Sequence, residues 1–123
     1  HNSVQKLINI QNSLSLKFKN LEISKLPNII AVSKTFKIEK ILPLIEFGHL
    51  HYGENKVQEA IDKWSDIKSQ NTALKLHLIG KLQTNKVKLS LKIFDYIHSV
   101  DNEKLAQKIS DEQFKQNKKI KIF

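Results

Sequence analysis

The segment His49–Gly80, HLHYGENKVQEAIDKWSDIKSQNTALKLHLIG, has the pattern of a strand, a helix and a second strand. Its two ends, His49–Gly53 and Lys75–Gly80, are short apolar runs. Between them, apolar residues recur at the spacing of one helix face. These residues are Val57, Ala60, Ile61, Trp64 and Ile67. Two strands separated by a helix indicate a βαβ unit with parallel strands.

The same pattern extends in both directions along the chain. Three further apolar runs, Asn28–Ser33, Phe94–Val100 and Lys119–Phe123, bring the strands to five, and their starts lie 19 to 26 residues apart. Such spacing is too wide for hairpins and suits strands separated by helices. Apolar residues at helical spacing fill each gap and also precede the first run. They are Val4, Leu7, Ile8 and Leu14, then Ile38, Ile41, Leu42 and Ile45, then Val87 and Leu91, and then Leu105, Ala106 and Ile109.

Two local features of these helices leave alternatives open. Pro43 interrupts the second helical segment, and we expect it to kink that helix or to displace its start. Asp101 and Asn102 precede the last helical segment, and either side chain could cap it.

The sequence therefore predicts an α/β protein with a helix, four βα units and a fifth strand. A five-stranded doubly wound sheet would be complete at 123 residues, whereas a (β/α)8 TIM barrel needs about 250. The chain ends inside an apolar strand with no helix to cover it, although parallel sheets are covered on both faces. We therefore favour a partial (β/α)8 barrel, with residues 1–123 forming the N-terminal half of a single domain.

Composition limits the classes of function. The chain has no cysteine, which excludes disulfides and thiolate metal sites. All 21 basic residues are lysines, against 12 acids, and the absence of arginine argues against a nucleic-acid interface. No apolar run approaches the roughly 20 residues of a membrane span, and residues 1–10 lack the apolar stretch of a signal peptide. We expect a cytoplasmic protein that binds neither nucleic acid nor membrane.

Lys34 stands out because it follows the first apolar run, where functional sites of parallel sheets form. Desolvation at the mouth of a sheet lowers the pKa of a lysine and favours the neutral amine, which can attack a carbonyl as Schiff-base lysines do. The alternative is a lysine that extends from a strand end into water. We expect the other 20 lysines to be solvated background.

His77 alternates with Leu76 and Leu78, so it should point into the barrel, as a core residue or as a ligand. His49 and His51 form an HxH pair without a nearby carboxylate, and we predict no metal site.

Three motifs at these strand ends carry a family resemblance. They are AVSKT at Ala31–Thr35, YGENKVQEA at Tyr52–Ala60 and HLIGKLQTNKVK at His77–Lys88, with IHSVD at Ile97–Asp101 in addition. In order and spacing they resemble the pyridoxal phosphate (PLP) homeostasis proteins, the YggS/PROSC-type family. The resemblance runs from about residue 4 to residue 123.

The resemblance implies a single-domain PLP-binding barrel like the N-terminal domain of alanine racemase, of PLP fold type III. It implies that Lys34 holds PLP as a Schiff base, that Asn55 lies beside the cofactor, and that His77 lies in the same barrel mouth. It further implies no catalysis, a role in PLP and vitamin B6 homeostasis, PLP-dependent apoenzymes as partners, and a monomeric full-length protein. The family's phosphate-binding segments would come from the second half of the barrel.

The sequence departs from the family pattern in two places. The third motif usually begins Trp-His-Phe, whereas this chain has Leu76-His77-Leu78, and Lys56 replaces the arginine that usually follows GEN. Leu76 and Leu78 keep the apolar character, so we expect only repacking there, and Lys56 agrees with the absence of arginine from the chain. A catalytic PLP enzyme of racemase type is the alternative. It would need a second acid/base, for which Tyr52 is conceivable but equally suited to packing.

Overall fold

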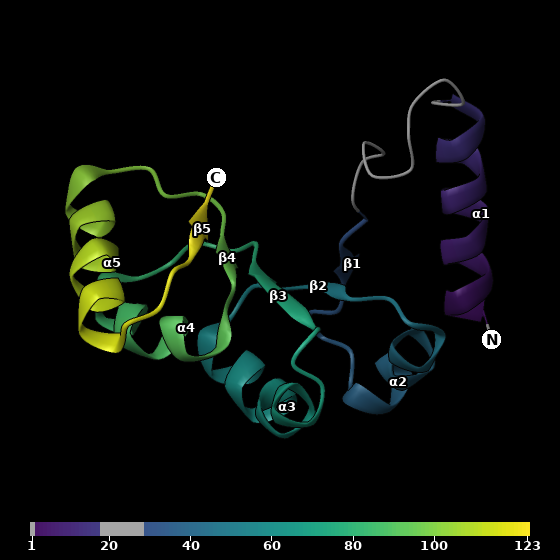
Figure 1. Cartoon of the computed structure of the whole chain (residues 1–123), viewed down its shortest axis with the longest axis horizontal. Helices are drawn as coiled ribbons and strands as arrows, with labels where there is room; N and C mark the ends of the chain where they lie inside the picture. Colours follow the sequence, from purple (N-terminus) through teal and green to yellow (C-terminus); the bar gives the residue numbers. More distant parts are fainter. Residues whose placement is uncertain (1, 18–28) are drawn as a thin grey trace.

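Five parallel strands form one sheet, in the order in which they occur along the chain (Figure 1). The computed structural model describes residues 2–17 and 29–123. The strands are β1 (Ala31–Val32), β2 (His51–Glu54), β3 (Lys75–Leu78), β4 (Tyr96–Ile97) and β5 (Lys121–Ile122). The predicted parallel α/β fold is therefore confirmed for the described residues.

The strands are shorter than the apolar runs that predict them, but their pairing extends one residue further. At the carboxyl ends of β1, β3 and β4, the next backbone N–H donates to the neighbouring strand. Ser33 donates to Gly53 over 2.9 Å, Ile79 to Glu54 over 2.9 Å, and His98 to Leu78 over 3.0 Å. These bonds fix the backbone where these three strands leave the sheet.

Helices precede the first strand and connect successive strands. They are α1 (Asn2–Lys17), α2 (Ile38–Phe47), α3 (Val57–Gln70), α4 (Val87–Ile93) and α5 (Glu103–Gln116), with a short 3₁₀ turn, η2 (Thr84–Lys86), before α4. In Figure 1, α2 to α5 follow one side of the sheet, and α1 lies beyond β1 and packs against α2. The predicted helices are all present, and among the described residues the sequence did not predict the short turn η2.

The structure resolves both local alternatives. Helix α2 begins at Ile38 and continues through Pro43, so the expected displacement of its start is wrong. It ends at Gly48, whose φ of 101° is the left-handed conformation that glycine adopts at helix C-termini. At α5, the Asn102 side chain accepts a hydrogen bond from the Leu105 N–H over 2.8 Å, so Asn102 rather than Asp101 is the cap.

Alternation along the strands separates two faces of the sheet. Tyr52, Leu76, Leu78 and Ile97 are buried in one cluster with Trp64 of α3, and we call this side the helix face. Because strand side chains alternate, His51, His77 and Tyr96 lie on the other side, the open face. In Figure 1 no described helix covers the open face.

The sheet is not closed into a barrel within the described residues. β1 and β5 are its two edges, and each pairs on one side only. Val32 and Phe123, at these edges, remain 51% and 66% exposed. An open five-stranded sheet with helices on one face fits part of a barrel better than a doubly wound sheet, which has helices on both faces.

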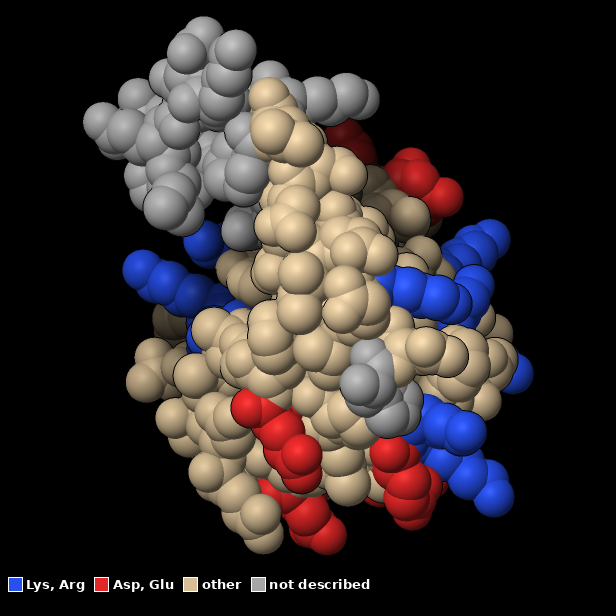
Figure 2. Space-filling view, turned by 90° about the vertical axis from the view of Figure 1, so that its right-hand side faces the viewer, with Lys and Arg blue, Asp and Glu red and all other residues tan. Residues whose placement is uncertain are grey.

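The surface near α1 carries charges of both signs. Figure 2 shows uncharged side chains in the centre of this view, acids below and at the upper right, and lysines at both sides. The basic net charge does not collect into one patch on this side. In the part of the chain that the structure describes, no helix has the length and apolar character to cross a membrane.

The cap of α5 gives a direct test of the helix boundary. We expect Asn102→Ala to lower the free energy of unfolding by about 1 kcal/mol, because the Leu105 N–H loses its acceptor. Asp101→Ala, the matched control, should change it by less than about 0.5 kcal/mol, since Asp101 is exposed. Urea unfolding of both variants measures the difference. An equal loss from both variants would contradict the assignment of the cap.

Candidate functional site

The carboxyl ends of β1 and β2 meet around a buried carboxylate. Glu54 is fully buried on the helix face, and its Oε2 accepts from the Ser33 hydroxyl, from Lys63 Nζ at 3.0 Å and from Trp64 Nε1 at 3.2 Å. Lys63 also donates to the Ser33 carbonyl. One carboxylate therefore joins the end of β1, the end of β2 and helix α3.

Lys34 follows Ser33 in a tight turn. The Phe36 N–H donates to the Ser33 carbonyl over 3.2 Å, and Thr35 has a φ of 67°, as the third residue of a type II turn requires. The Thr35 N–H donates to Glu59 Oε1 of α3 over 3.2 Å. Lys34 thus lies between two residues that are held by hydrogen bonds to the rest of the fold.

The side chain of Lys34 is exposed. The expected desolvation of this amine is therefore not provided by the described residues. Lys34 follows the first strand, as the sequence predicts, but its side chain is exposed to solvent.

Asn55 lies at the end of β2, in close contact with the loop that follows β3. A Cβ atom on Gly80 would come within 2.6 Å of the Asn55 carbonyl oxygen and 2.7 Å of its Cβ. Only glycine allows this approach, so the GEN and HLIG motifs depend on each other sterically. The two strand ends form one continuous edge beside Lys34.

His77 lies on the open face, as its alternation with Leu76 and Leu78 predicts. Its partner on β2 is Gly53, which has no side chain, and its partner on β4 is Tyr96. The His77 ring stacks on Tyr96 with centroids 4.2 Å apart and planes within 4°. It is 4% exposed, and its two nitrogens contact His51 Nδ1 at 2.9 Å and His98 Nε2 at 3.0 Å.

Burial is the main reason why the pKa of His77 falls from 6.5 to about 4, and proximity to His51 and His98 lowers it further. Asp95 acts in the opposite direction. The pKa of His51 is also lowered, first by burial and then by Lys75. The imidazole at the centre of the open face is therefore neutral at physiological pH.

Tyr52 is a packing residue and lies on the helix face. It is fully buried, 4.9 Å from Trp64 between ring centroids, and its hydroxyl donates to the His49 carbonyl over 2.7 Å. Burial raises its pKa. The conceivable role of Tyr52 as a second acid/base is therefore wrong for this geometry.

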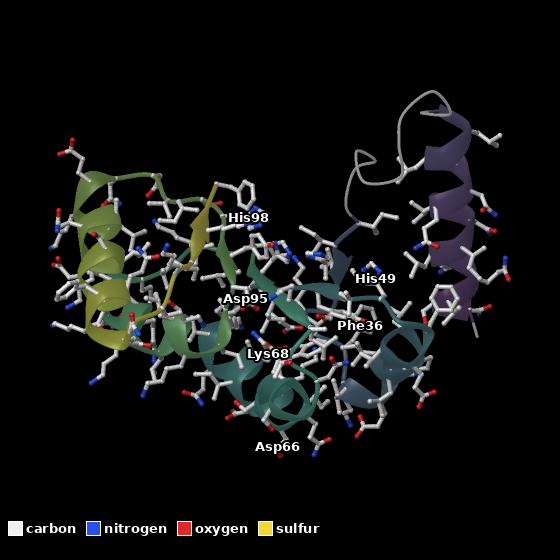
Figure 3. All side chains as sticks on the ribbon, viewed as in Figure 1. Phe36, His49, Asp66, Lys68, Asp95 and His98 are labelled. Atoms are coloured by element: carbon white, nitrogen blue, oxygen red, sulfur yellow. The ribbon has the colours of Figure 1, made fainter. Side chains whose placement is uncertain are left out.

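Three lysines contradict the expectation that all but Lys34 are solvated background. Lys118 donates to the Leu91 carbonyl, and burial lowers its pKa. Lys63 has a side chain only 8% exposed in its pair with Glu54. Lys68 pairs with Asp95 at 2.6 Å and donates to the Ile93 carbonyl over 2.7 Å. Figure 3 shows Lys68 of α3 beneath the sheet and Asp95 beside it. Lys63 and Lys68 are not close to their partners in the sequence, so no local motif predicts these ion pairs. The one indication in the sequence is strand alternation, which places Glu54 on the same face as Tyr52.

The expected absence of a metal site was based on the HxH pair. Within residues 2–17 and 29–123, no group of three or more histidine and acidic side chains is arranged to hold a metal ion.

Comparison with known proteins identifies what this arrangement resembles. A protein named pyridoxal phosphate homeostasis protein from Vibrio cholerae is 40% identical over 87 residues, covering 69% of this chain and 37% of the relative. The protein of the same name from Haemophilus influenzae is 33% identical over 114 residues, covering 86% and 48%. No protein-family model matches the chain.

Solved structures give the same answer. PipY of Synechococcus elongatus PCC7942 matches with a TM-score of 0.73 without PLP and 0.72 with PLP bound, at 38% and 37% identity. Each comparison covers 80% of this chain and about half of PipY. The α/β fold is thus that of the N-terminal half of the PipY structures. The chain is homologous to the pyridoxal phosphate homeostasis proteins, as its motifs predict, and it spans 37% to 48% of the length of the two relatives above.

The Glu54 contacts predict a large cost for a small change. We expect Glu54→Gln to lower the free energy of unfolding by about 3 kcal/mol, because it leaves the Lys63 ammonium buried without its counter-charge. Lys115→Ala is the control, since Lys115 is 68% exposed in its pair with Glu112 and should change stability by less than about 1 kcal/mol. Adding Lys63→Met to Glu54→Gln should restore part of the loss. Chemical denaturation that finds the two single variants equal would refute the structural role of Glu54.

The lowered pKa of His77 predicts a pH dependence. The folded value lies below that of the unfolded chain, so the unfolded state binds more protons between about pH 4 and 6.5. Stability is therefore full above pH 6.5 and falls with decreasing pH, by up to about 3 kcal/mol from this residue. We expect His77→Phe, which keeps an aromatic ring against Tyr96, to flatten the decrease measured by urea unfolding between pH 7 and 4.5. An unchanged slope in this variant would contradict the prediction.

Proposed function

We propose that this chain forms the N-terminal half of a PLP-holding (β/α)8 barrel that carries or buffers PLP without turnover, in the cytoplasm. The observation that supports it most directly is the likeness to PipY with PLP bound, at 37% identity over 80% of this chain. The position of Lys34 agrees with it. An exposed primary amine lies at the carboxyl edge of a parallel sheet, where the sites of such folds form.

The residues at this edge fit the cofactor chemically. PLP carries an aldehyde, and when bound it supplies an electron-withdrawing ring and a carbon that a lysine amine can attack. Lys34 would hold it as a Schiff base. Asn55 offers an amide that donates and accepts hydrogen bonds, and the absence of a side chain at Gly80 lets Asn55 pack directly against the loop after β3.

His77 would serve this site as a neutral imidazole on the open face. It is 4% exposed and fixed between Tyr96 and two further histidines, so its ring has a defined orientation. We assign it to the lining of the barrel mouth. PLP is the expected ligand, and PLP-dependent apoenzymes are the expected recipients.

A racemase-type reaction finds less support at this site. Such enzymes need an acid/base on each side of the cofactor. Tyr52, the candidate that the sequence offers, is buried on the helix face with its hydroxyl bonded to the His49 carbonyl. A panel of amino acids incubated with PLP-loaded protein tests this alternative through turnover, and we expect none.

Selective trapping of Lys34 tests the proposal. The chain is incubated with PLP, reduced with borohydride, and the modified lysines are identified by mass spectrometry. We expect Lys34 to be modified severalfold faster than Lys81, which is also exposed and follows β3 at the same edge. Lys34→Ala should remove the preferred adduct and the associated absorbance band, and Lys81→Ala should retain both.

Two results would contradict the proposal. If PLP modified Lys34 no faster than Lys81, the carboxyl edge of the sheet would not direct PLP to Lys34. Tight, stoichiometric binding by residues 1–123 alone would contradict the assignment of half a pocket, because we expect weak binding when only one wall is supplied.

A further inference from the structure

Three histidines from neighbouring strands form a continuous hydrogen-bonded chain on the open face, which we call the imidazole chain. His51 Nδ1 lies 2.9 Å from His77 Nε2, and His77 Nδ1 lies 3.0 Å from His98 Nε2. His77 is bonded through both nitrogens, while each outer histidine uses one. The imidazole chain crosses β2 and β3 and ends just beyond β4.

Aromatic neighbours hold these rings in place. His77 stacks on Tyr96, and His98 stacks on Phe123 with centroids 4.8 Å apart and planes within 17°. His77 is buried, whereas His51 and His98 are each partly exposed. Figure 3 shows His98 at the upper end of β4, beside β5. The imidazole chain therefore has a buried centre and two ends that water reaches.

The charged and titratable groups around the imidazole chain come from β3, from β4 with the residue before it, from β5, and from His49, which precedes β2 and interacts electrostatically with His51. Lys75 precedes His77 on β3 and acts on His51, while Asp95 precedes β4 and favours the charged forms of His51 and His77. Tyr96 faces His77 on β4, and Lys121 of β5 lies 5.7 Å from the centre of the Tyr96 ring. β1 contributes Ala31 and Val32, which do not titrate.

The bonding pattern restricts where protons can be. A neutral imidazole donates through one nitrogen and accepts through the other. With all three rings neutral, the protons point either from His51 toward His98 or from His98 toward His51. A proton that arrives on His98 Nδ1 moves the His98 Nε2 proton to His77 Nδ1, the His77 Nε2 proton to His51 Nδ1, and the His51 Nε2 proton to water. One proton enters, one leaves, and the direction of the chain reverses.

We propose that the imidazole chain is a single-proton relay between the carboxyl edge of the sheet at His98 and the start of β2 at His51. A cationic His98 must donate to His77, and a cationic His51 must do the same. Neutral His77 has one acceptor nitrogen, so it can accept from one end only. Protonation of one end therefore excludes protonation of the other while both hydrogen bonds persist. The low pKa of His77, about 4, keeps the central ring neutral.

Ring-nitrogen NMR of ¹⁵N-histidine-labelled chain between pH 4.5 and 8 tests the relay. In the unmodified protein, we expect one end of the imidazole chain to take up a proton first. The other end should take one up at a pH lower by at least about one unit, which is a tenfold lower proton affinity. His51→Gln removes one end, and His98 should then titrate in a single step at higher pH. His49→Gln is the matched control, because His49 lies on the same segment outside the imidazole chain and should leave the His98 titration unchanged.

A second variant separates coupling from simple proximity. His77→Phe keeps a ring against Tyr96 and removes both bridging nitrogens, so His51 and His98 should titrate independently. Should this variant not fold, the His51→Gln titration decides. Simultaneous cationic signals from His51 and His98 in the unmodified chain with both hydrogen bonds intact would overturn the relay. A His98 titration that is identical in the unmodified chain and His51→Gln would overturn it as well.

Discussion

The buried carboxylate of Glu54 is the contact on which the site depends. It is fully buried, and burying an ionised group is costly unless a counter-charge and hydrogen bonds satisfy it. Lys63 and Trp64 of α3 and the Ser33 hydroxyl, directly after β1, all donate to Oε2, while Oε1 is buried without a hydrogen-bond partner in the described structure. Because Ser33 directly precedes Lys34, the same carboxylate that fixes α3 on the sheet also fixes the backbone that presents the lysine.

Helix α3 holds the sheet at both ends through this chemistry. Lys63 reaches the carboxyl end of β1 and β2, and Lys68 reaches Asp95 at the start of β4. Asp95 Oδ2 also accepts from the Leu76 N–H over 2.9 Å, so one carboxylate joins β3, β4 and α3. The apolar stripe around Trp64 fills the space between these two polar anchors. Helix position, strand register and strand-end geometry are therefore coupled through one element.

The elements themselves were predictable from the sequence because their signals are local. Alternation around His77 and the stripe around Trp64 each follow from the repeat of a single strand or helix. The cap of α5 was narrowed to two residues, since both Asp101 and Asn102 have suitable side chains and only the backbone geometry distinguishes them. Pro43 does not displace the start of α2, because packing of Ile41 and its neighbours on the sheet retains the helix on both sides of it.

Contacts that depend on strand register were not predictable. His51 and His77 meet because they are diagonal neighbours on adjacent strands, and Gly53, directly opposite His77, leaves that space open. His98 meets His77 by the same diagonal relation on the other side. A shift of one residue in either pairing would move one of these rings to the helix face. The roles of Lys63 and Lys68 were hidden for a related reason, since their partners at Glu54 and Asp95 are 9 and 27 residues away.

The two faces of the sheet have different roles, since the helix face stabilises the fold and the open face carries the candidate reactive groups. On the helix face, polar groups such as Glu54 are paired and enclosed, so they hold geometry and do not react. On the open face, Lys34 is exposed and His77 lies between two partners through which a proton can pass. Lys34 gains its position from the backbone of Ser33 and Thr35, both of which are bonded to glutamates, rather than from burial. The chain therefore presents an exposed amine and an ordered set of imidazoles on one surface, which agrees with the proposal that it forms one wall of a PLP site.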